Sequence, residues 1–229
     1  MGAGVAGDDN TEKLRKQLEG LLAAKGYEIV DDPESCDYCY LHVWPKQNNI
    51  VFVQRSMPVI DLVEKFMHEE REVNKSQKKT GKLIPISTLK GVDTIPALAQ
   101  TVHANGSKVI ATCVVCNPWI LTNLEPYCDG LIANFGVPQK AQIAVVTGEY
   151  NPTGLLPITM VSSEAVIATN WEYLEDGRIY EICVSPNDVP GYDKDQYIDP
   201  AILETVPGGS YAYCDSEGNY YKAWFGLSY

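Results

Sequence analysis

Apolar and polar positions along this chain follow two different periods. Between Thr11 and Lys25 leucines recur at helical spacing and Gly26 follows as a stop, so this stretch predicts an amphipathic helix. Between Lys108 and Val115 the residues are almost continuously apolar, which is typical of a strand buried on both faces of a parallel sheet. The same reasoning predicts helices at Val59 to Asn74, Thr94 to Ala104, Asn117 to Leu124 and Pro138 to Val146, and strands at Tyr27 to Val30, Asp37 to Trp44 and Gly130 to Phe135.

This alternation of strand and helix predicts an α/β fold with a mostly parallel sheet and helices on both faces, an α/β sandwich. Residues 161–229 differ, because they are rich in Tyr, Asp, Gly and Pro, and they predict an irregular, partly antiparallel appendage. We therefore expect a flexible N-terminus over residues 1–10, a sandwich core over 11–160, and a C-terminal extension packed on that core over 161–229.

Charge and composition exclude several partners. The chain has 18 Lys and Arg against 30 Asp and Glu, a net charge of −12, so we expect no nucleic-acid partner. No apolar stretch approaches the ~20 residues of a membrane helix, so we expect no membrane partner. The start lacks the pattern of an export signal, and seven cysteines are an odd number. Both observations favour a cytoplasmic protein with reduced thiols.

Two cysteine pairs have the C-x-x-C spacing, Cys36/Cys39 and Cys113/Cys116. They fit either a four-thiolate zinc site or buried strand residues. Residues three apart on a strand point to opposite faces, and neither pair has a glycine-rich knuckle, so we favour strands and expect no metal. The G-x-G-x-x-G of Gly2 to Gly7 has no strand before it, so we expect no nucleotide cofactor either.

Two polar segments near the C-terminal half are interpreted as structural. Asp193, Asp195 and Asp199 resemble a cation loop, but the Gly and terminal Glu of calcium loops are missing, which favours an acidic surface loop. The run from Asn151 to Gly154 is turn chemistry, because Pro fixes φ and Gly permits positive φ. We expect the following Leu155 to Ile158 to be extended.

Two segments carry a family resemblance. Gly148 to Thr159 reads GEYNPTGLLPIT, and Trp224 to Tyr229 reads WFGLSY. In this order and at this separation they resemble the G-x-x-N-P-[ST]-G-x-L-P and F-G-x-G-L-S-Y segments of the C-terminal α/β domain of glycoside hydrolase family 3, the β-glucosidase-type enzymes. The likeness extends from Leu21 to Tyr229, and Pro45 to Leu89 matches poorly.

The resemblance implies how catalysis is divided. Retaining hydrolysis needs two carboxyl groups about 5 Å apart. The family's nucleophile lies in an [ST]-D-[WFY] tripeptide on a (β/α)8-type barrel, and this sequence contains no such tripeptide; Thr169 to Trp171 has an amide in place of the acid. The resemblance therefore implies that the nucleophile is on a barrel domain absent from this chain, and that the isolated chain is inactive.

In many members the acid/base comes from a loop of this domain, and the matching window here is Pro45 to Leu89. Its acidic residues are Asp61, Glu64, Glu69, Glu70 and Glu72. Glu69 and Glu70 are the acid/base candidates, because they lie near His68 and near the expected end of the helix. The alternative is that these acids form a solvated helix face.

Two functions remain open. The first is the C-terminal domain of a family 3 β-glucosidase-like enzyme, which contributes to the sugar site and to the acid/base, with the barrel domain and a β-linked glucoside or oligosaccharide as partners. The second is a non-catalytic carbohydrate- or protein-binding module. An exposed apolar patch would favour the first, because a lost domain interface leaves one, and it would promote a homodimer. The aromatic residues that fit either sugar stacking or the core of the extension are Tyr211, Tyr213, Tyr220, Tyr221 and Trp224.

Overall fold

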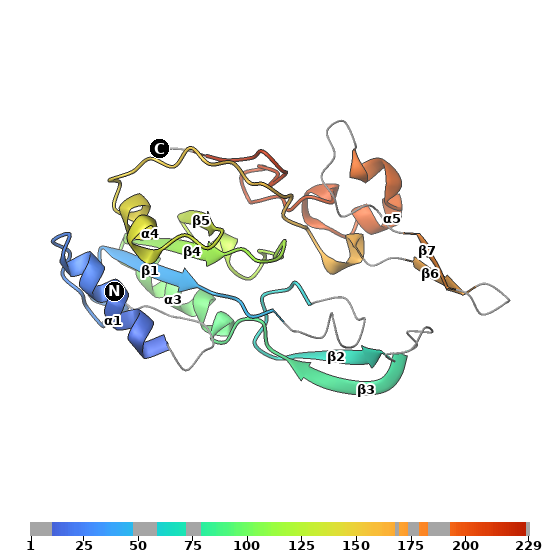
Figure 1. The fold of residues 1–229 in the computed structure, drawn as a ribbon, viewed down its shortest axis with the longest axis horizontal. Helices are drawn as coiled ribbons and strands as arrows, with labels where there is room; N and C mark the ends of the chain where they lie inside the picture. Colours follow the sequence, from blue (N-terminus) through green and yellow to red (C-terminus); the bar gives the residue numbers. More distant parts are fainter. Residues whose placement is uncertain are drawn as a thin grey trace.

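The structure is a computed structural model that describes residues 11–47, 59–71, 79–167, 170–173, 179–182 and 193–227. At its centre is a three-stranded parallel sheet in the order β1-β4-β5 (Figure 1). The strands are β1 (Tyr38–Val43), β4 (Lys108–Val114) and β5 (Gly130–Asn134). All three coincide with predicted strands, so the prediction of an α/β fold with a parallel sheet is confirmed.

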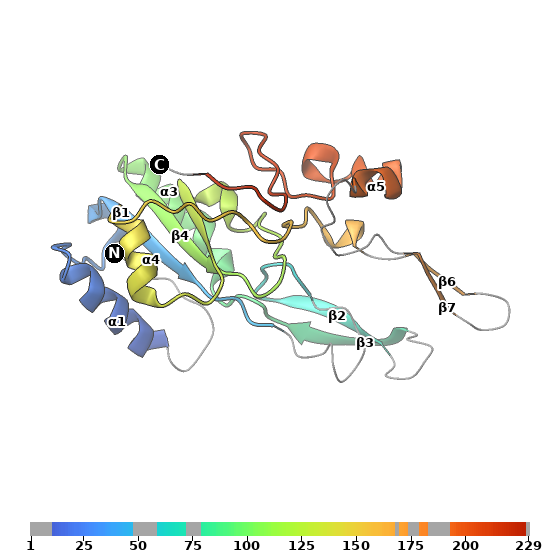
Figure 2. The ribbon, with the colours of Figure 1, turned by 45° about the horizontal axis from the view of Figure 1, so that its top comes forward.

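The other described elements lie around this sheet and beyond one of its ends (Figure 1). The α-helices are α1 (Thr11–Ala23), α3 (Ile95–Ala104), α4 (Gln139–Val146) and α5 (Pro200–Leu203). Two antiparallel hairpins, β2 (Phe66–Arg71) with β3 (Lys79–Ile86) and β6 (Asn170–Tyr173) with β7 (Ile179–Ile182), project from the same end of the molecule (Figures 1 and 2). Short 3-10 helices are η1 (Pro33–Ser35), η2 (Val92–Thr94), η3 (Glu125–Tyr127), η4 (Glu164–Val166), η5 (Lys194–Tyr197) and η6 (Pro207–Gly209).

Helices pack on both faces of the sheet. On one face Leu18 of α1 and Ile143 of α4 are buried against Tyr40 of β1. On the other face Val102 of α3 is buried in one cluster with Leu41 of β1, and α3 lies across the sheet from α1 and α4 (Figures 1 and 2). Because both faces are covered, β1 is buried along its length except at its first residue.

Three predicted elements are wrong. The stretch Val59 to Asn74 is not a helix, because Phe66–Arg71 forms β2 and pairs with β3; residues 72–74 lie outside the description. Tyr27 to Val30 forms no strand, and Asn117 to Leu124 forms no helix. In the last case Ile120 instead makes a parallel bridge to Asp61, so tertiary pairing replaces a local helix.

Asp129 fixes the amino-terminal end of β4. Its carboxylate accepts hydrogen bonds of 2.8 Å each from the Val109 amide, the Lys108 ammonium and the His103 ring. Burial alone would raise the pKa of Asp129, but these donors outweigh burial and lower the pKa to about 2. The carboxylate therefore ties α3 and β4 to the turn that precedes β5.

The described part of residues 161–227 is irregular and partly antiparallel, as predicted. Val161 pairs with Ala212, and Cys214 pairs with Tyr220, as isolated antiparallel bridges. Tyr213 is buried in the same hydrophobic cluster as the sheet, so the extension shares the core. Within the described ranges, no helix is both long and apolar enough to cross a membrane.

Candidate functional site at the carboxyl end of the sheet

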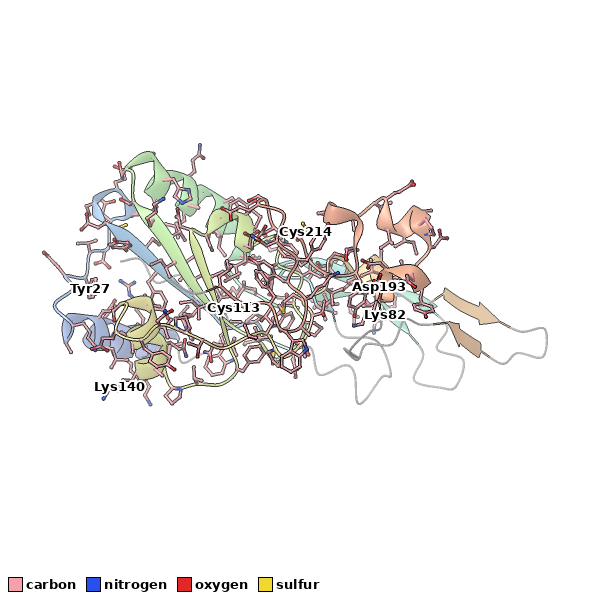
Figure 3. The ribbon with its side chains drawn as sticks, turned by 90° about the horizontal axis from the view of Figure 1, so that it is seen from above. Tyr27, Lys82, Cys113, Lys140, Asp193 and Cys214 are labelled. Atoms are coloured by element: carbon pink, nitrogen blue, oxygen red, sulfur yellow. The ribbon has the colours of Figure 1, made fainter. Side chains whose placement is uncertain are left out.

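The carboxyl ends of β1, β4 and β5 meet at one end of the sheet, where open α/β sheets bind ligands. Gln47, which follows β1, donates through Nε2 to Asn117 Oδ1 at 2.8 Å and to the Cys116 carbonyl at 3.3 Å, both in the loop after β4. Trp44, also after β1, is exposed. These polar and aromatic groups form the rim of the candidate site. In Figure 3, Tyr27 and Lys140 lie towards one end of the molecule, Lys82 and Asp193 lie towards the other, and Cys113 of β4 lies between them.

The loop after β5 presents a second exposed ring at this end. Asn134 is buried, and its Oδ1 accepts the amides of Gly136 and Val137, each at 2.9 Å. Gly136 has a φ of 86°, which permits this tight turn. The turn leaves Phe135 exposed to solvent. Asn134 therefore holds a fixed backbone from which the phenyl ring projects.

Two half-buried carboxyl groups lie beside this rim. Asp61 pairs by its backbone with Ile120, in the loop after β4. Glu164 Oε1 accepts the amide of Ile60 at 3.4 Å, which brings it next to the same short segment. Burial raises the pKa of Asp61. Burial also raises the pKa of Glu164, the negative charge of Asp61 raises it further, and the Ile60 amide lowers it only in part.

Because both pKa values are raised, this pair holds a proton up to a higher pH than ordinary carboxyl groups do. A carboxyl group with a raised pKa remains protonated when an ordinary one is ionised, and it can then donate that proton to a leaving group. Glu64 has a different role, because its Oε2 accepts the Gly91 amide at 2.9 Å and so fixes the loop before η2. Asp61 was within the window expected to supply an acid/base, whereas Glu164 had no local sequence signal.

The structure places the two acid/base candidates elsewhere. Glu69 and Glu70 lie on β2, where Glu69 pairs with Leu83 across the hairpin. The expectation that they end a helix is therefore wrong, because the register with β3 fixes an extended backbone there. Their catalytic role stays a prediction, and Glu72 lies outside the described residues.

A buried polar chain lies on the α4 side of the sheet. The Tyr40 hydroxyl and the Thr112 hydroxyl are hydrogen-bonded at 2.8 Å, and His42 Nδ1 lies 3.1 Å from the same Thr112 oxygen. Burial raises the pKa of Tyr40 to about 12. Burial lowers the pKa of His42 more than the neighbouring Gln142 amide raises it, which favours a neutral imidazole. This chain links β1 to β4 and is structural.

The cysteines divide between strand and loop. Cys39 and Cys113 are buried strand residues, as predicted, and burial raises the pKa of both thiols, that of Cys39 to about 11. Cys116 lies beyond the end of β4 and is exposed, and Cys36 precedes β1, so the strand prediction is wrong for these two cysteines. Among the described residues no three His, Cys, Asp or Glu side chains are grouped as a metal would require.

The acidic loop and the aromatic residues have internal partners. Asp193 and Asp199 cap η5 and α5, and Asp195 accepts the Ser210 hydroxyl and the Tyr211 amide, each at 2.7 Å. The Tyr213 hydroxyl donates to Glu125 at 2.8 Å. Tyr211 and Tyr213 are thus core residues of the extension, whereas Tyr220 and Trp224 are exposed.

The two segments that carry the family resemblance lie side by side. The Leu156 amide donates to the Phe225 carbonyl at 2.8 Å, and the Trp224 amide donates to the Leu156 carbonyl at 2.8 Å. Gly226 approaches so closely that a Cβ there would lie 2.9 Å from the Gly154 carbonyl oxygen. Leu155 to Ile158 contains no helix, in keeping with the extended backbone expected there.

Comparison of the chain with models of protein families, with curated proteins and with solved structures found no match. The described residues define an α/β protein with a polar and aromatic rim, and with two carboxyl groups of raised pKa, at the carboxyl end of a parallel sheet.

Proposed function

We propose that this chain is the α/β-sandwich domain of a β-glucosidase-like enzyme of the glycoside hydrolase family 3 type. In this proposal the domain contributes to the sugar site, and a barrel domain outside the given sequence carries the nucleophile. The observation that carries the proposal is the pairing of the two resembling segments. Leu156 and Trp224 are separated by 68 positions (224 − 156), yet their backbones are hydrogen-bonded. A resemblance made of two distant motifs gains support when the fold brings them into contact.

The carboxyl end of the sheet supplies the chemistry. We propose Asp61 as the acid/base that this domain contributes, with Glu164 as a second carboxyl group beside it. Asp61 belongs to the window in which the resemblance expects an acid, it is half-buried, and its pKa is raised by that burial. A general acid needs a raised pKa, because it must be protonated when the substrate binds.

Exposed apolar side chains support a partner domain at this end. Trp44 follows β1, and Phe135 and Val137 follow β5, so all three leave the sheet at its carboxyl end, and all three are exposed. Apolar side chains that gather at one end of a sheet are typical of a contact surface. These side chains support a partner that covers this end of the sheet, which is the place that the proposal gives to the barrel domain.

Sugar binding tests the proposal directly. The isotope-labelled chain is titrated with a β-linked glucose disaccharide up to about 10 mM, which detects affinities weaker than millimolar. We expect the amide signals of Gln47, Asn117 and Phe135 to shift together and to saturate. Asp61→Asn should weaken binding several-fold or change its pH dependence, and Glu69→Gln should leave both unchanged.

Two results would contradict the proposal. One is an absence of shifts at this end of the sheet over the whole titration. The other is equal loss of binding in Asp61→Asn and Glu69→Gln when circular dichroism shows that both variants are folded. A folded Glu69→Gln that does not bind would place the site at β2.

A further inference from the structure

Trp224 combines two properties that rarely occur together. Its φ is 73°, and it is the one residue other than glycine with positive φ in the described part of the chain. Its side chain is 72% exposed, more than any other large hydrophobic side chain that the structure describes. Positive φ is unfavourable for a bulky residue, because the Cβ approaches the backbone carbonyl.

The local turn explains where this conformation comes from. The Phe225 amide donates to the Lys222 carbonyl at 2.9 Å, which closes a four-residue turn with Trp224 at its third position. Turns that need positive φ at this position take Gly or Asn there. Every other positive-φ position in the described chain is glycine. Tryptophan is therefore unfavourable at this position, because the turn requires positive φ there.

The turn is also held rigidly. The Trp224 amide donates to the Leu156 carbonyl, and the Ala223 amide donates to the Thr159 hydroxyl at 3.0 Å. The Phe225 ring stacks on Tyr221 with ring centroids 4.9 Å apart. The indole therefore projects from a fixed backbone, and a ligand that contacts it has little chain ordering to overcome.

Among the residues that the structure describes, burial does not compensate for this conformation, because most of the surface of Trp224 stays exposed to water. A strained residue persists when the strain serves a contact, and here the exposed ring directs that contact outward. We infer that Trp224 is a binding platform for the apolar face of a neutral pyranose ring in an oligosaccharide, outside the carboxyl end of the sheet.

The indole ring of Trp224 and the net charge of the chain indicate the chemistry of the ligand. An indole face carries negative charge density, and the axial C–H bonds of a β-linked pyranose present a flat face of weak positive charge to it. The net charge of −12 disfavours phosphorylated or acidic ligands. The choice of a sugar rests on the proposed function, whereas the contact role of Trp224 rests on its φ and its exposure.

The experiment uses Trp224→Gly and Trp224→Asn in the full chain, with Tyr150→Ala as the control at another exposed aromatic side chain. Cello-oligosaccharides of two to six units are titrated while the four tryptophan indole signals are followed by NMR. We expect one indole signal, missing in both variants, to shift and saturate. Affinity for the longer oligosaccharides should fall at least tenfold in both variants and stay unchanged in Tyr150→Ala.

Stability gives a second, independent reading. Because Gly and Asn accept positive φ, both variants should melt at the same temperature as the parent chain or up to about 4 °C above it. A clear loss of melting temperature would show that the indole stabilises the fold, and it would overturn the inference. Unchanged oligosaccharide affinity in both variants would overturn it as well. So would variants in which a dimer of the chain dissociates while sugar binding is kept.

Asp61→Asn separates this inference from the proposed function. If the platform is right and the site at the sheet is wrong, Asp61→Asn leaves all binding intact and the Trp224 variants lose it. If the site is right and the platform is wrong, disaccharide binding depends on Asp61 and the Trp224 variants bind every oligosaccharide normally. Absence of any sugar binding by the parent chain overturns both.

Discussion

The contact between the two resembling segments can be tested with one methyl group. In Gly226→Ala the new Cβ would lie 2.9 Å from the Gly154 carbonyl oxygen and 2.9 Å from Leu155 Cδ2. The Leu155 side chain is exposed and can rotate away, but the carbonyl belongs to the backbone. The two segments must therefore separate by a few tenths of an ångström, or their hydrogen bonds must break.

The magnitude follows from overpacking. Forcing a methyl group against a fixed neighbour destabilises by about 1–3 kcal/mol. Gly154→Ala is the matched control, because its Cβ would have no atom within 4 Å and its φ is not positive, so it should be neutral or stabilising by about 0.4–1 kcal/mol. A difference of about 1–4 kcal/mol between the two variants corresponds to roughly 2–16 °C in melting temperature for a domain of this size.

Two assays measure the effect. Urea unfolding gives the global free energy, and amide hydrogen exchange of Leu156 and Trp224 reports on the two hydrogen bonds between the segments. We expect both amides to exchange faster in Gly226→Ala and at the parent rate in Gly154→Ala. Equal stability and equal exchange in the two variants would refute the contact, and with it the support that the contact gives to the proposed function.

Three further outcomes are expected. Gly208→Ala should be about 2 kcal/mol less stable than Gly209→Ala in urea unfolding, because both have positive φ but only the first places a Cβ 2.4 Å from Cys214 Cβ; equal values would contradict the packing of η6. Asp129 has a lowered pKa, so its contribution to stability is present above its unfolded pKa and is lost as pH falls towards about 2, and Asp129→Asn should abolish this part of the acid dependence of the melting temperature. The given chain alone should not hydrolyse aryl-β-glucosides, and nitrophenol release that co-purifies with the protein would show that a nucleophile is present.

Sequence patterns predicted the parts of the fold that are locally determined. The run Lys108 to Val115 is apolar enough to be a central strand in any context, and the leucines of Thr11 to Lys25 define one helix face. The stretch Val59 to Asn74 has apolar residues at helical spacing, and the helix prediction based on that spacing is wrong. There the backbone pairing of β2 with β3 decides the outcome, and that pairing joins residues whose relation no local pattern reveals.

The candidate site could be predicted only in part. Asp61 was within the expected window, but its partner Glu164 lies 103 positions away (164 − 61), in the C-terminal extension. No spacing rule connects the two carboxyl groups, and only the folded chain brings Glu164 to the Ile60 amide. Trp224 belonged to a resembling segment, but its positive φ is a property of the backbone that the sequence alone does not reveal.

The rings of the C-terminal extension offer a built-in optical signal. Tyr213 and Tyr221 meet edge to face at 5.4 Å, and Phe225 stacks on Tyr221. Aromatic rings held in a fixed asymmetric arrangement produce near-ultraviolet circular dichroism, and this signal is lost when packing is lost even if helices persist. Release of the last segment from the core can therefore be followed in the unlabelled protein by its near-ultraviolet signal. The far-ultraviolet signal reports separately on the helices α1, α3 and α4.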